Sequence, residues 1–413
     1  MDNLAHFTIT RLPRILFGSG RISELPALIA AYGQHTLIVT GERSFRATAQ
    51  WPALTRALVE HKIHYDELRV SGEPSPQFVD DAVAHFHTHN IKSVIGIGGG
   101  SVLDAAKAIA GLLPYGNSVL DHLENVGRNI PYHGPALPFI AVPTTAGTGS
   151  EATKNAVLSV SGEHGYKKSF RHETLVPEYA LIDPDLLATC PSALIAADGM
   201  DAFTQLLESF VSIKANYFTD ALAWSGMEAV HQGFFAALTD NKANTLADNN
   251  GADNGEGADA ATGRAWMAYA SLLSGITLAQ VGLGSVHGLA SPLGAFFPIP
   301  HGVACGTLVA AATQINITAL RARAPQHAAL AKYARVGRLL DNNPEMSDVR
   351  AQDHLVTRLS RWTEQLALPR LSHFGVRDSD IPRIVANSRG SSMATNPLVL
   401  HDTEIAVIVQ ARL

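Results

Sequence analysis

The spacing of apolar positions divides the chain into two parts. Up to about residue 190, short runs rich in β-branched residues alternate with amphipathic stretches, which is typical of a parallel sheet covered by helices. Beyond that point these runs stop, and apolar residues recur at helical spacing to the end of the chain. The pattern predicts an α/β domain at 1–188 and an all-helical domain at 189–413, with the boundary near the Pro-bearing segment 184–191.

Individual elements follow from the same pattern. In the first part we expect strands at 35–41, 92–100, 138–145, 155–160 and 179–184, with helices at 22–33 and 76–90 among them. In the second part we expect helices at 199–213, 217–237, 264–281, 302–320 and 326–340. The apolar stretch 265–284 approaches the length of a membrane span. It mixes Ser, Thr, Gln and Gly among small residues, so it predicts a buried core helix and no association with a membrane.

Residues 239–263 break the helical pattern. They are rich in Asp, Asn, Gly and Ala and almost free of large apolar side chains, so they bury too little surface to offset the entropy of ordering. We expect an exposed, mobile insertion between two helices. A calcium-binding loop is the sharper alternative, but the segment lacks the terminal Glu of an EF-hand in register.

Composition narrows the class of protein. At 413 residues the chain is long enough for two domains, and 46% apolar residues suffice for a large core. A net charge of −6 without a long basic run argues against nucleic acid as a partner. Cys190 and Cys305 are the only cysteines, which fits a reducing compartment. No signal peptide is evident, so we expect a cytoplasmic protein.

Two glycine-rich segments follow predicted strands. GIGGGSVLDAAKAIAG begins at Gly96 and opens a predicted helix, whose N-terminal N–H groups and dipole favour an anion such as a pyrophosphate. Taken alone, this segment is equally consistent with a tight strand-to-helix turn. VPTTAGTGSEATKNAV at 142–157 adds a second loop dense in hydroxyl groups that can donate to phosphate or ribose oxygens. The pair predicts a nucleotide site.

Polar residues that can bind a metal lie in the helical part. Asp201 and Gln205 are four residues apart and therefore share one face of a helix. His287 and His301 each precede a glycine within apolar surroundings. Imidazole and carboxylate groups are ligands of divalent iron and zinc. Each histidine taken singly is better explained as a core residue that is hydrogen-bonded to the backbone.

Together, the paired loops, the early segment FGSGRISELP and the order of these polar residues resemble the iron-containing (group III) alcohol dehydrogenases. The resemblance covers nearly the whole chain except 239–263. It implies a nicotinamide dinucleotide across the first domain, substrate in the cleft between the domains, and a homodimer. The residues it assigns to the dinucleotide are Gly99, Gly100, Ser101, Asp104, Thr144, Thr145, Thr148, Asn155 and Lys167. It assigns Asp201, Gln205, His287 and His301 to the metal, with Asp201, His287 and His301 catalytic.

Two positions depart from the family pattern. Gln205 stands where the family has a histidine ligand, and a neutral amide is a poorer ligand than imidazole for iron or zinc. Ser291 stands where the family often has a further histidine, so the reaction proton needs another route. We expect a bound Fe²⁺ or Zn²⁺; the alternative is that Gln205 hydrogen-bonds substrate and no metal is held.

The choice between NAD and NADP depends on the end of the strand at 35–41. NAD-preferring relatives often place Asp there, whereas this chain has Gly41 followed by Glu42 and Arg43. Loss of the Asp leaves room for a 2′-phosphate, with which Arg43 or Arg46 could pair. Glu42 argues the other way. We expect NAD or NADP to be accepted.

The sequence therefore predicts an NAD(P)-dependent oxidoreductase that interconverts an alcohol and an aldehyde or ketone by metal-assisted hydride transfer. A glycerol-dehydrogenase-like or dehydroquinate-synthase-like enzyme shares the expected fold, although the TTAGTGSE loop favours the alcohol dehydrogenase branch. A metal-free homologue that binds nucleotide without turnover is the alternative from a different class.

Overall fold

The computed structural model describes residues 6–124, 126–239 and 259–413. The chain forms two compact units. The α/β unit consists of Thr10–Val160 and Gly165–Cys190. The helical unit consists of Pro191–Leu413 together with Ser161–His164 and the described residues before Thr10. The predicted fold class, a parallel sheet with helices followed by a helical part, is confirmed.

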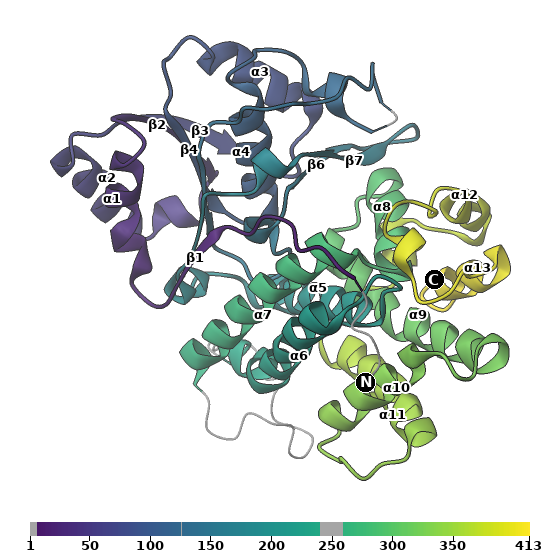
Figure 1. Ribbon diagram of the computed structural model, residues 1–413. Helices are drawn as coiled ribbons and strands as arrows, with labels where there is room; N and C mark the ends of the chain where they lie inside the picture. Colours follow the sequence, from purple (N-terminus) through teal and green to yellow (C-terminus); the bar gives the residue numbers. More distant parts are fainter. Residues whose placement is uncertain (1–5, 125, 240–258) are drawn as a thin grey trace. The chain divides into compact units, whose positions relative to one another are not determined.

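A six-stranded parallel sheet forms the centre of the α/β unit (Figure 1), in the order β1-β8-β5-β4-β2-β3. Its strands are β1 (Arg14–Phe17), β2 (His35–Gly41), β3 (His64–Val70), β4 (Ser93–Gly98), β5 (Phe139–Pro143) and β8 (Tyr179–Ile182). Gly98 at the end of β4 pairs with Pro143 at the end of β5. The two glycine-rich segments therefore begin side by side, at the carboxyl ends of two neighbouring inner strands.

Helices cover both faces of this sheet because successive side chains of its inner strands are apolar. Leu37 of β2 packs toward α3 (Pro76–Phe86) and α4 (Gly100–Leu112). Ile38, the next residue, packs toward α1 (Leu25–Ala30) and α2 (Gln50–Glu60) on the other face. Figure 1 shows these two pairs of helices on opposite faces. This near-continuous apolar pattern is typical of a parallel sheet buried on both sides.

The expected strands at 35–41, 92–100, 138–145 and 179–184 correspond to β2, β4, β5 and β8. The expected strand at 155–160 exists as β6 (Asn155–Val160), but it pairs antiparallel with β7 (Tyr166–Arg171) in a separate two-stranded sheet. The pattern did not predict β1, β3 or β7. Both β1 and β3 are edge strands, whose partly exposed side chains need not be apolar.

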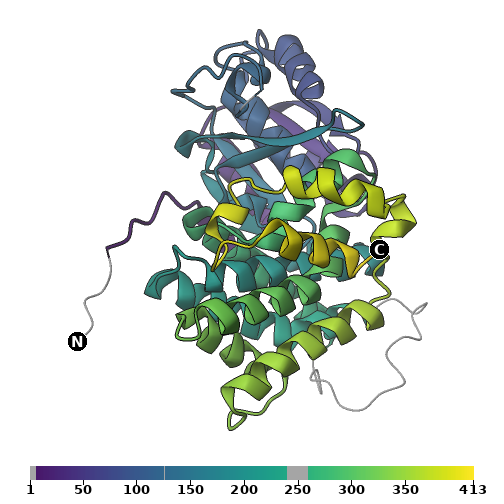
Figure 2. The same ribbon diagram turned by 90° about the vertical axis from the view of Figure 1, so that its right-hand side faces the viewer.

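The helical unit contains nine described α-helices. They are α5 (Ser192–Val211), α6 (Tyr217–Ala237), α7 (Ala260–Val281), α8 (Ser285–Phe296), α9 (His301–Arg323), α10 (Ala328–Leu340), α11 (Asp348–Gln365), α12 (Ile381–Ala386) and α13 (Asp402–Gln410). α6 packs on α7, α10 on α11 and α5 on α9, and Figure 2 shows the teal and green helices running side by side. The expected helix at 217–237 is confirmed with the same bounds.

Short 3-10 helices connect several elements. They are η1 (Arg21–Glu24), η2 (Phe45–Ala47), η3 (Val119–His122), η4 (Ser150–Ala152), η5 (Glu173–Leu175), η6 (Pro184–Leu187), η8 (Leu371–Phe374), η9 (Asp378–Asp380) and η10 (Met393–Thr395). The helix expected at 22–33 is divided between η1 and α1. Most of the expected insertion at 239–263, including the considered calcium loop, lies outside the described residues.

By length and composition, one described helix could cross a membrane, and the bent pair of α7 and α8 passes the same test when counted together. The single helix is α9, of whose apolar window 67% is buried inside the protein. α7, expected to be a core helix, packs on α5 and α6 and buries residues around much of its circumference. These helices therefore fill the core of the helical unit.

A buried lysine joins α4 to the second glycine-rich segment. The Lys107 Nζ atom lies 2.7–3.0 Å from four oxygens: the Ser150 carbonyl and hydroxyl, the Thr153 hydroxyl and the Asn155 carbonyl. Burial lowers the pKa of Lys107 to about 8, against the opposing charges of Asp104 and Glu151. Burial also raises the pKa of Glu151 to about 7. Ionising either group in the core therefore carries a desolvation cost.

This cost predicts a pH-dependent stability. The folded protein binds the Glu151 proton more tightly than the unfolded chain, so its stability falls as pH rises from about 4.5 to about 7. Glu151→Gln cannot ionise. The difference between its free energy of urea-induced unfolding and that of wild type should increase by about 3 kcal/mol from pH 4.5 to pH 8. The exposed Glu60→Gln is the control. Parallel pH profiles for wild type and Glu151→Gln would contradict this assignment.

Candidate functional site

A buried polar cluster interrupts the apolar core of the helical unit. Asp201, Gln205 and Glu208 lie on one face of α5 and are 1%, 3% and 6% exposed. His287 comes from the first turn of α8, and His301 is the first residue of α9. The structure thus brings together all four residues that the sequence analysis assigned to a metal.

The Asp201 carboxylate is the centre of this cluster. Its Oδ1 atom lies 3.2 Å from His287 Nε2 and 3.8 Å from His301 Nε2. On the other side of the His287 ring, Nδ1 lies 2.6 Å from Glu208 Oε2. Glu208 is itself held by the Val286 N–H, 2.7 Å from Oε1. Because Nδ1–H donates to Glu208, the His287 ring is fixed with Nε2 directed at Asp201.

Cys305 completes the cluster from α9. It lies one helical turn after His301, and its Sγ atom is 3.6 Å from His287 Nε2 and 3.8 Å from His301 Nε2. One ligand atom from each of Asp201, His287, His301 and Cys305 lies within 4.8 Å of the others. Neither Cys305 nor Glu208 was predicted from the sequence as a site residue. The spacing HGVAC, four residues from His301 to Cys305, was the available signal.

Two glycines allow α9 to approach α5 this closely. A Cβ atom at Gly302 would lie 2.7 Å from the Ala197 carbonyl oxygen, and one at Gly306 would lie 2.8 Å from the Met200 Cβ. Real side chains do not tolerate such contacts. The glycine that follows His301 and the one that follows Cys305 therefore keep these two helices in contact beside the cluster.

Gln205 contacts Asp201 through its amide nitrogen. Its Nε2 atom donates to Asp201 Oδ2 at 3.1 Å, while its Oε1 atom accepts from the Ser274 hydroxyl at 2.7 Å. Ser291 lies one turn after His287 on α8 and is exposed, with its hydroxyl 3.5 Å from the His287 carbonyl oxygen.

The ionisation states of the cluster follow from burial and mutual contact. Burial raises the pKa of Asp201, but the charge of His301 and the hydrogen bond from His287 outweigh it and hold that pKa below its ordinary value. Burial lowers the pKa of His287, but Cys305, Asp201 and Glu208 together raise it well above its ordinary value. Burial raises the pKa of Cys305 to about 12. A cation bound here would displace the imidazole and thiol protons.

The donor set fits a divalent transition metal. It combines a carboxylate oxygen, two imidazole nitrogens and a thiol sulfur, all converging from three packed helices. Glu208 supplies the outer hydrogen bond that metal-binding histidines in proteins usually make. The arrangement can hold a Lewis acid in a site where three donors are buried and His301 remains partly exposed.

In the α/β unit, the two glycine-rich segments pack against each other. Gly99 caps α4, and Thr144 N donates to the Gly98 carbonyl at 3.0 Å. A Cβ atom at Gly100 would lie 2.7 Å from the Thr148 side chain, and one at Gly99 would lie 3.2 Å from Thr145. The expected residues Gly99, Gly100, Thr144, Thr145 and Thr148 are therefore gathered at the N-terminus of α4.

The other expected cofactor residues lie nearby on α4 or on the hairpin. Ser101 is in the first turn of α4, and Asp104 Oδ1 accepts from the Ser150 hydroxyl at 2.6 Å. Asn155 begins β6. Lys167 pairs with Ser159 toward the other end of this hairpin, and its Nζ atom lies 2.6 Å from Glu73 Oε1.

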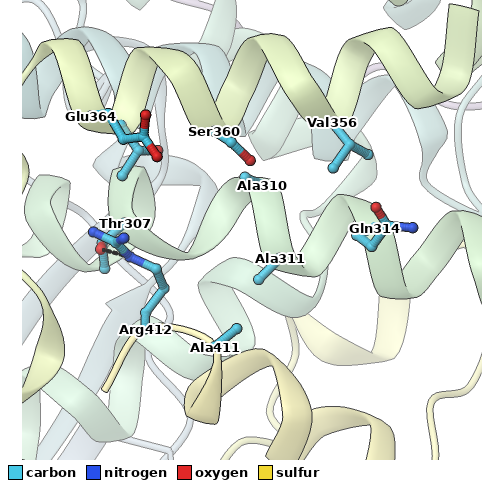
Figure 3. Close-up of a pocket in the computed structure, with 10 residues that line it drawn as sticks. Thr307, Ala310, Ala311, Gln314, Val356, Ser360, Glu364, Ala411 and Arg412 are labelled. Atoms are coloured by element: carbon cyan, nitrogen blue, oxygen red, sulfur yellow. Dashed lines mark hydrogen bonds between the residues drawn. The ribbon is translucent and has the colours of Figure 1, made fainter.

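A pocket of about 290 Å³ lies elsewhere in the helical unit, lined by α9, α11 and the C-terminal residues (Figure 3). Glu364 and Arg412 are its charged lining residues, and Arg412 Nε donates to the Thr307 hydroxyl at 2.7 Å. None of the residues of the polar cluster lines this pocket. The chemistry-bearing side chains thus lie apart from it.

Comparison with known proteins gives consistent matches over both units. Residues 13–184 match the family model of the iron-containing alcohol dehydrogenases. Residues 195–413 match the C-terminal model of the Fe-containing alcohol dehydrogenase family. Alcohol dehydrogenase 4 of Schizosaccharomyces pombe is 30% identical over 411 residues, covering 96% of this chain and 86% of the relative. The NAD-dependent methanol dehydrogenase of Bacillus methanolicus is 26% identical and covers 96% of this chain and 97% of that enzyme.

Solved structures agree with this match. A 1,3-propanediol oxidoreductase superposes with a TM-score of 0.85 at 27% identity, covering 99% of this chain and 100% of that one. An iron-containing alcohol dehydrogenase from Thermotoga maritima superposes with a TM-score of 0.79 at 25% identity, covering 99% of each chain.

The contact between Glu208 and His287 predicts an effect on metal affinity. Glu208→Gln keeps the side-chain size but removes the charge that orients the imidazole. We expect zinc affinity, measured by competition with a chelator, to fall by roughly 10–100-fold. Glu345→Gln, at an exposed position of the same unit, should leave that affinity unchanged. Equal affinities for wild type and Glu208→Gln would show that Glu208 does not position a ligand.

Proposed function

Because the chain belongs to the iron-containing alcohol dehydrogenase family and is an alcohol–aldehyde oxidoreductase, we propose that it transfers hydride between a small alcohol and NAD(P) with a divalent metal at Asp201, His287 and His301. The observation that carries the metal assignment is that ligand atoms of these three residues and of Cys305 lie within 4.8 Å of one another. The family implies NAD(H) and a divalent metal as cofactors.

The helical unit would hold the reacting oxygen. A divalent cation bound at the cluster acts as a Lewis acid that polarises the alcohol or carbonyl oxygen. Asp201 supplies negative charge, Glu208 fixes the His287 ring, and the surrounding helices bury these three side chains, while His301 stays partly exposed. Ser291 is a poor proton acceptor at neutral pH, so we infer that the alcohol proton leaves through solvent.

The α/β unit would bind the dinucleotide. The N-terminus of α4 offers N–H groups and the positive end of the helix dipole to the pyrophosphate. Thr144, Thr145 and Thr148 can donate to phosphate or ribose oxygens from the adjoining segment. Lys107 supports the proposal because its bonds fix that segment on α4. We assign Asn155 and Lys167 to the ribose and nicotinamide end, as the resemblance implies.

We also propose that the protein accepts NADP as well as NAD. Glu42 and Arg43 directly follow β2 and are exposed. Arg46 forms an ion pair with Glu67 at 2.7 Å and lies over the Trp51 ring. Arg43 is thus the better candidate to pair with a 2′-phosphate.

We further propose a small primary alcohol or diol as substrate and a cytoplasmic homodimer as the working form. Relatives named methanol and 1,3-propanediol dehydrogenases support the substrate class. Cys190 and Cys305 form no disulfide within the described residues, which fits a reducing compartment. The homodimer rests on the family resemblance.

A nucleotide-binding homologue without turnover is the second candidate. The observation that favours it is the closed hydrogen-bonding of the cluster, in which His287 contacts Asp201 and Glu208 while Gln205 occupies the other Asp201 oxygen. Such a network satisfies its buried charges from within the protein.

Turnover separates these two candidates. Zinc- or iron-loaded protein should reduce NAD⁺ with at least one member of a panel of primary alcohols and diols. His301→Ala should lower kcat/KM by roughly 100-fold or more, because it removes a ligand of the Lewis acid. NADH binding to His301→Ala, measured by fluorescence, should be unchanged. His354→Ala, on the surface of α11, is the control. Absence of turnover with every alcohol and metal would overturn the enzyme assignment in favour of the homologue.

Arg43→Ala tests the cofactor preference. If Arg43 pairs with the 2′-phosphate, its loss should raise KM for NADP⁺ roughly tenfold and leave KM for NAD⁺ unchanged. Arg56→Ala, an exposed arginine of the neighbouring α2, should alter neither value. The proposal fails if the two cofactors respond equally to Arg43→Ala, or if the wild type does not use NADP⁺.

A further inference from the structure

The amide of Gln205 is turned away from any role as a ligand. Its nitrogen faces Asp201 Oδ2 at 3.1 Å, and an amide NH2 group does not bind a cation because its lone pair is delocalised into the carbonyl and both hydrogens are donors. The reversed amide would place its oxygen against a carboxylate oxygen and lose the hydrogen bond to Asp201. The oxygen therefore stays with the Ser274 hydroxyl, 2.7 Å away. Gln205 thus hydrogen-bonds Asp201 and does not itself act as a ligand. Three of the four ligands that the family resemblance assigns remain.

Cys305 supplies a donor at the required distance. In a tetrahedral zinc site, bonds of about 2.3 Å to sulfur and about 2.05 Å to nitrogen place these two atoms about 3.6 Å apart. Cys305 Sγ lies 3.6 Å from His287 Nε2 and 3.8 Å from His301 Nε2. The edge between nitrogen and oxygen would be about 3.3 Å, and His287 Nε2 lies 3.2 Å from Asp201 Oδ1. Three donor pairs therefore lie within about 0.2 Å of tetrahedral separations, while His301 Nε2 lies 3.8 Å from Asp201 Oδ1 and would have to move closer.

The surroundings of Cys305 distinguish it from an ordinary core cysteine. A buried thiol usually packs among apolar atoms as a small hydrophobic group. This one is 0% exposed, yet its sulfur contacts two imidazole nitrogens beside a carboxylate. Its place one turn after His301 repeats on α9 the spacing of Asp201 and Gln205 on α5.

We propose that Cys305 replaces position 205 as the fourth ligand, giving a set of one carboxylate, two imidazoles and one thiolate that prefers zinc to iron. The proposal rests on the metal-dependent function inferred above and concerns the same site. On coordination the thiol loses its proton to solvent and the metal–sulfur bond forms. Thiolate is a soft ligand and favours Zn²⁺, whereas carboxylate and water favour harder ions.

Cobalt substitution tests sulfur ligation directly. Apoprotein of the full chain, loaded with Co²⁺, should show the intense near-ultraviolet charge-transfer band of a cobalt–thiolate bond. The chain has two cysteines, so Cys190→Ser is the matched control and should keep the band. Cys305→Ser should lose it. Cys305→Ala is the second variant, in case a buried hydroxyl disturbs folding.

Competition between metals tests the preference. With equimolar Zn²⁺ and Fe²⁺ under anaerobic conditions, wild type should retain zinc, and Cys305→Ser should lower the bound zinc-to-iron ratio at least about tenfold. Cobalt bound to wild type without the band, or an unchanged ratio in Cys305→Ser, would overturn the proposal while leaving metal-dependent function intact. No stoichiometric binding of any divalent metal would overturn both.

Discussion

The packing of α5, α8 and α9 depends on the need to satisfy the buried Asp201 carboxylate. A carboxylate that is 1% exposed costs several kcal/mol unless charged or hydrogen-bonding groups meet it. Its partners come from α5, α8 and α9, which otherwise pack through apolar side chains and glycines. Apolar contacts alone tolerate small shifts of one helix along another. The need to satisfy Asp201 fixes which turns of these helices face each other.

A second buried charge has the same effect in the α/β unit. Lys107 binds oxygens of the segment that follows β5, and it does so from the middle of α4. The glycine-rich turn before α4 and the threonines of the next segment are thereby kept in contact. Each unit thus orders a functional region around one desolvated ion whose hydrogen-bonding partners are specified by sequence.

The pattern of apolar residues along the chain predicted the elements whose side chains are buried. The inner strands β2, β4, β5 and β8 were identified because both faces of the sheet demand apolar residues, while the edge strand β3 escaped notice with its partly exposed side chains. The order of Asp201, His287 and His301 indicated a common site, and the structure gathers them. The direction of the Gln205 amide could not be predicted from spacing, since it depends on Ser274 of α7, which is far from Gln205 along the chain. Cys305 was considered only for the redox compartment, because its contacts with His287 and His301 exist only once α8 and α9 are packed together.

The central claim is that the buried cluster around Asp201 is a metal site. Anomalous diffraction from crystals of the zinc-loaded protein, recorded on both sides of the zinc absorption edge, tests it most directly. We expect one strong peak enclosed by Asp201, His287, His301 and Cys305, about 2.3 Å from the sulfur and about 2.0–2.1 Å from the imidazole nitrogens. A cluster without a peak, with zinc only on surface histidines, would contradict it.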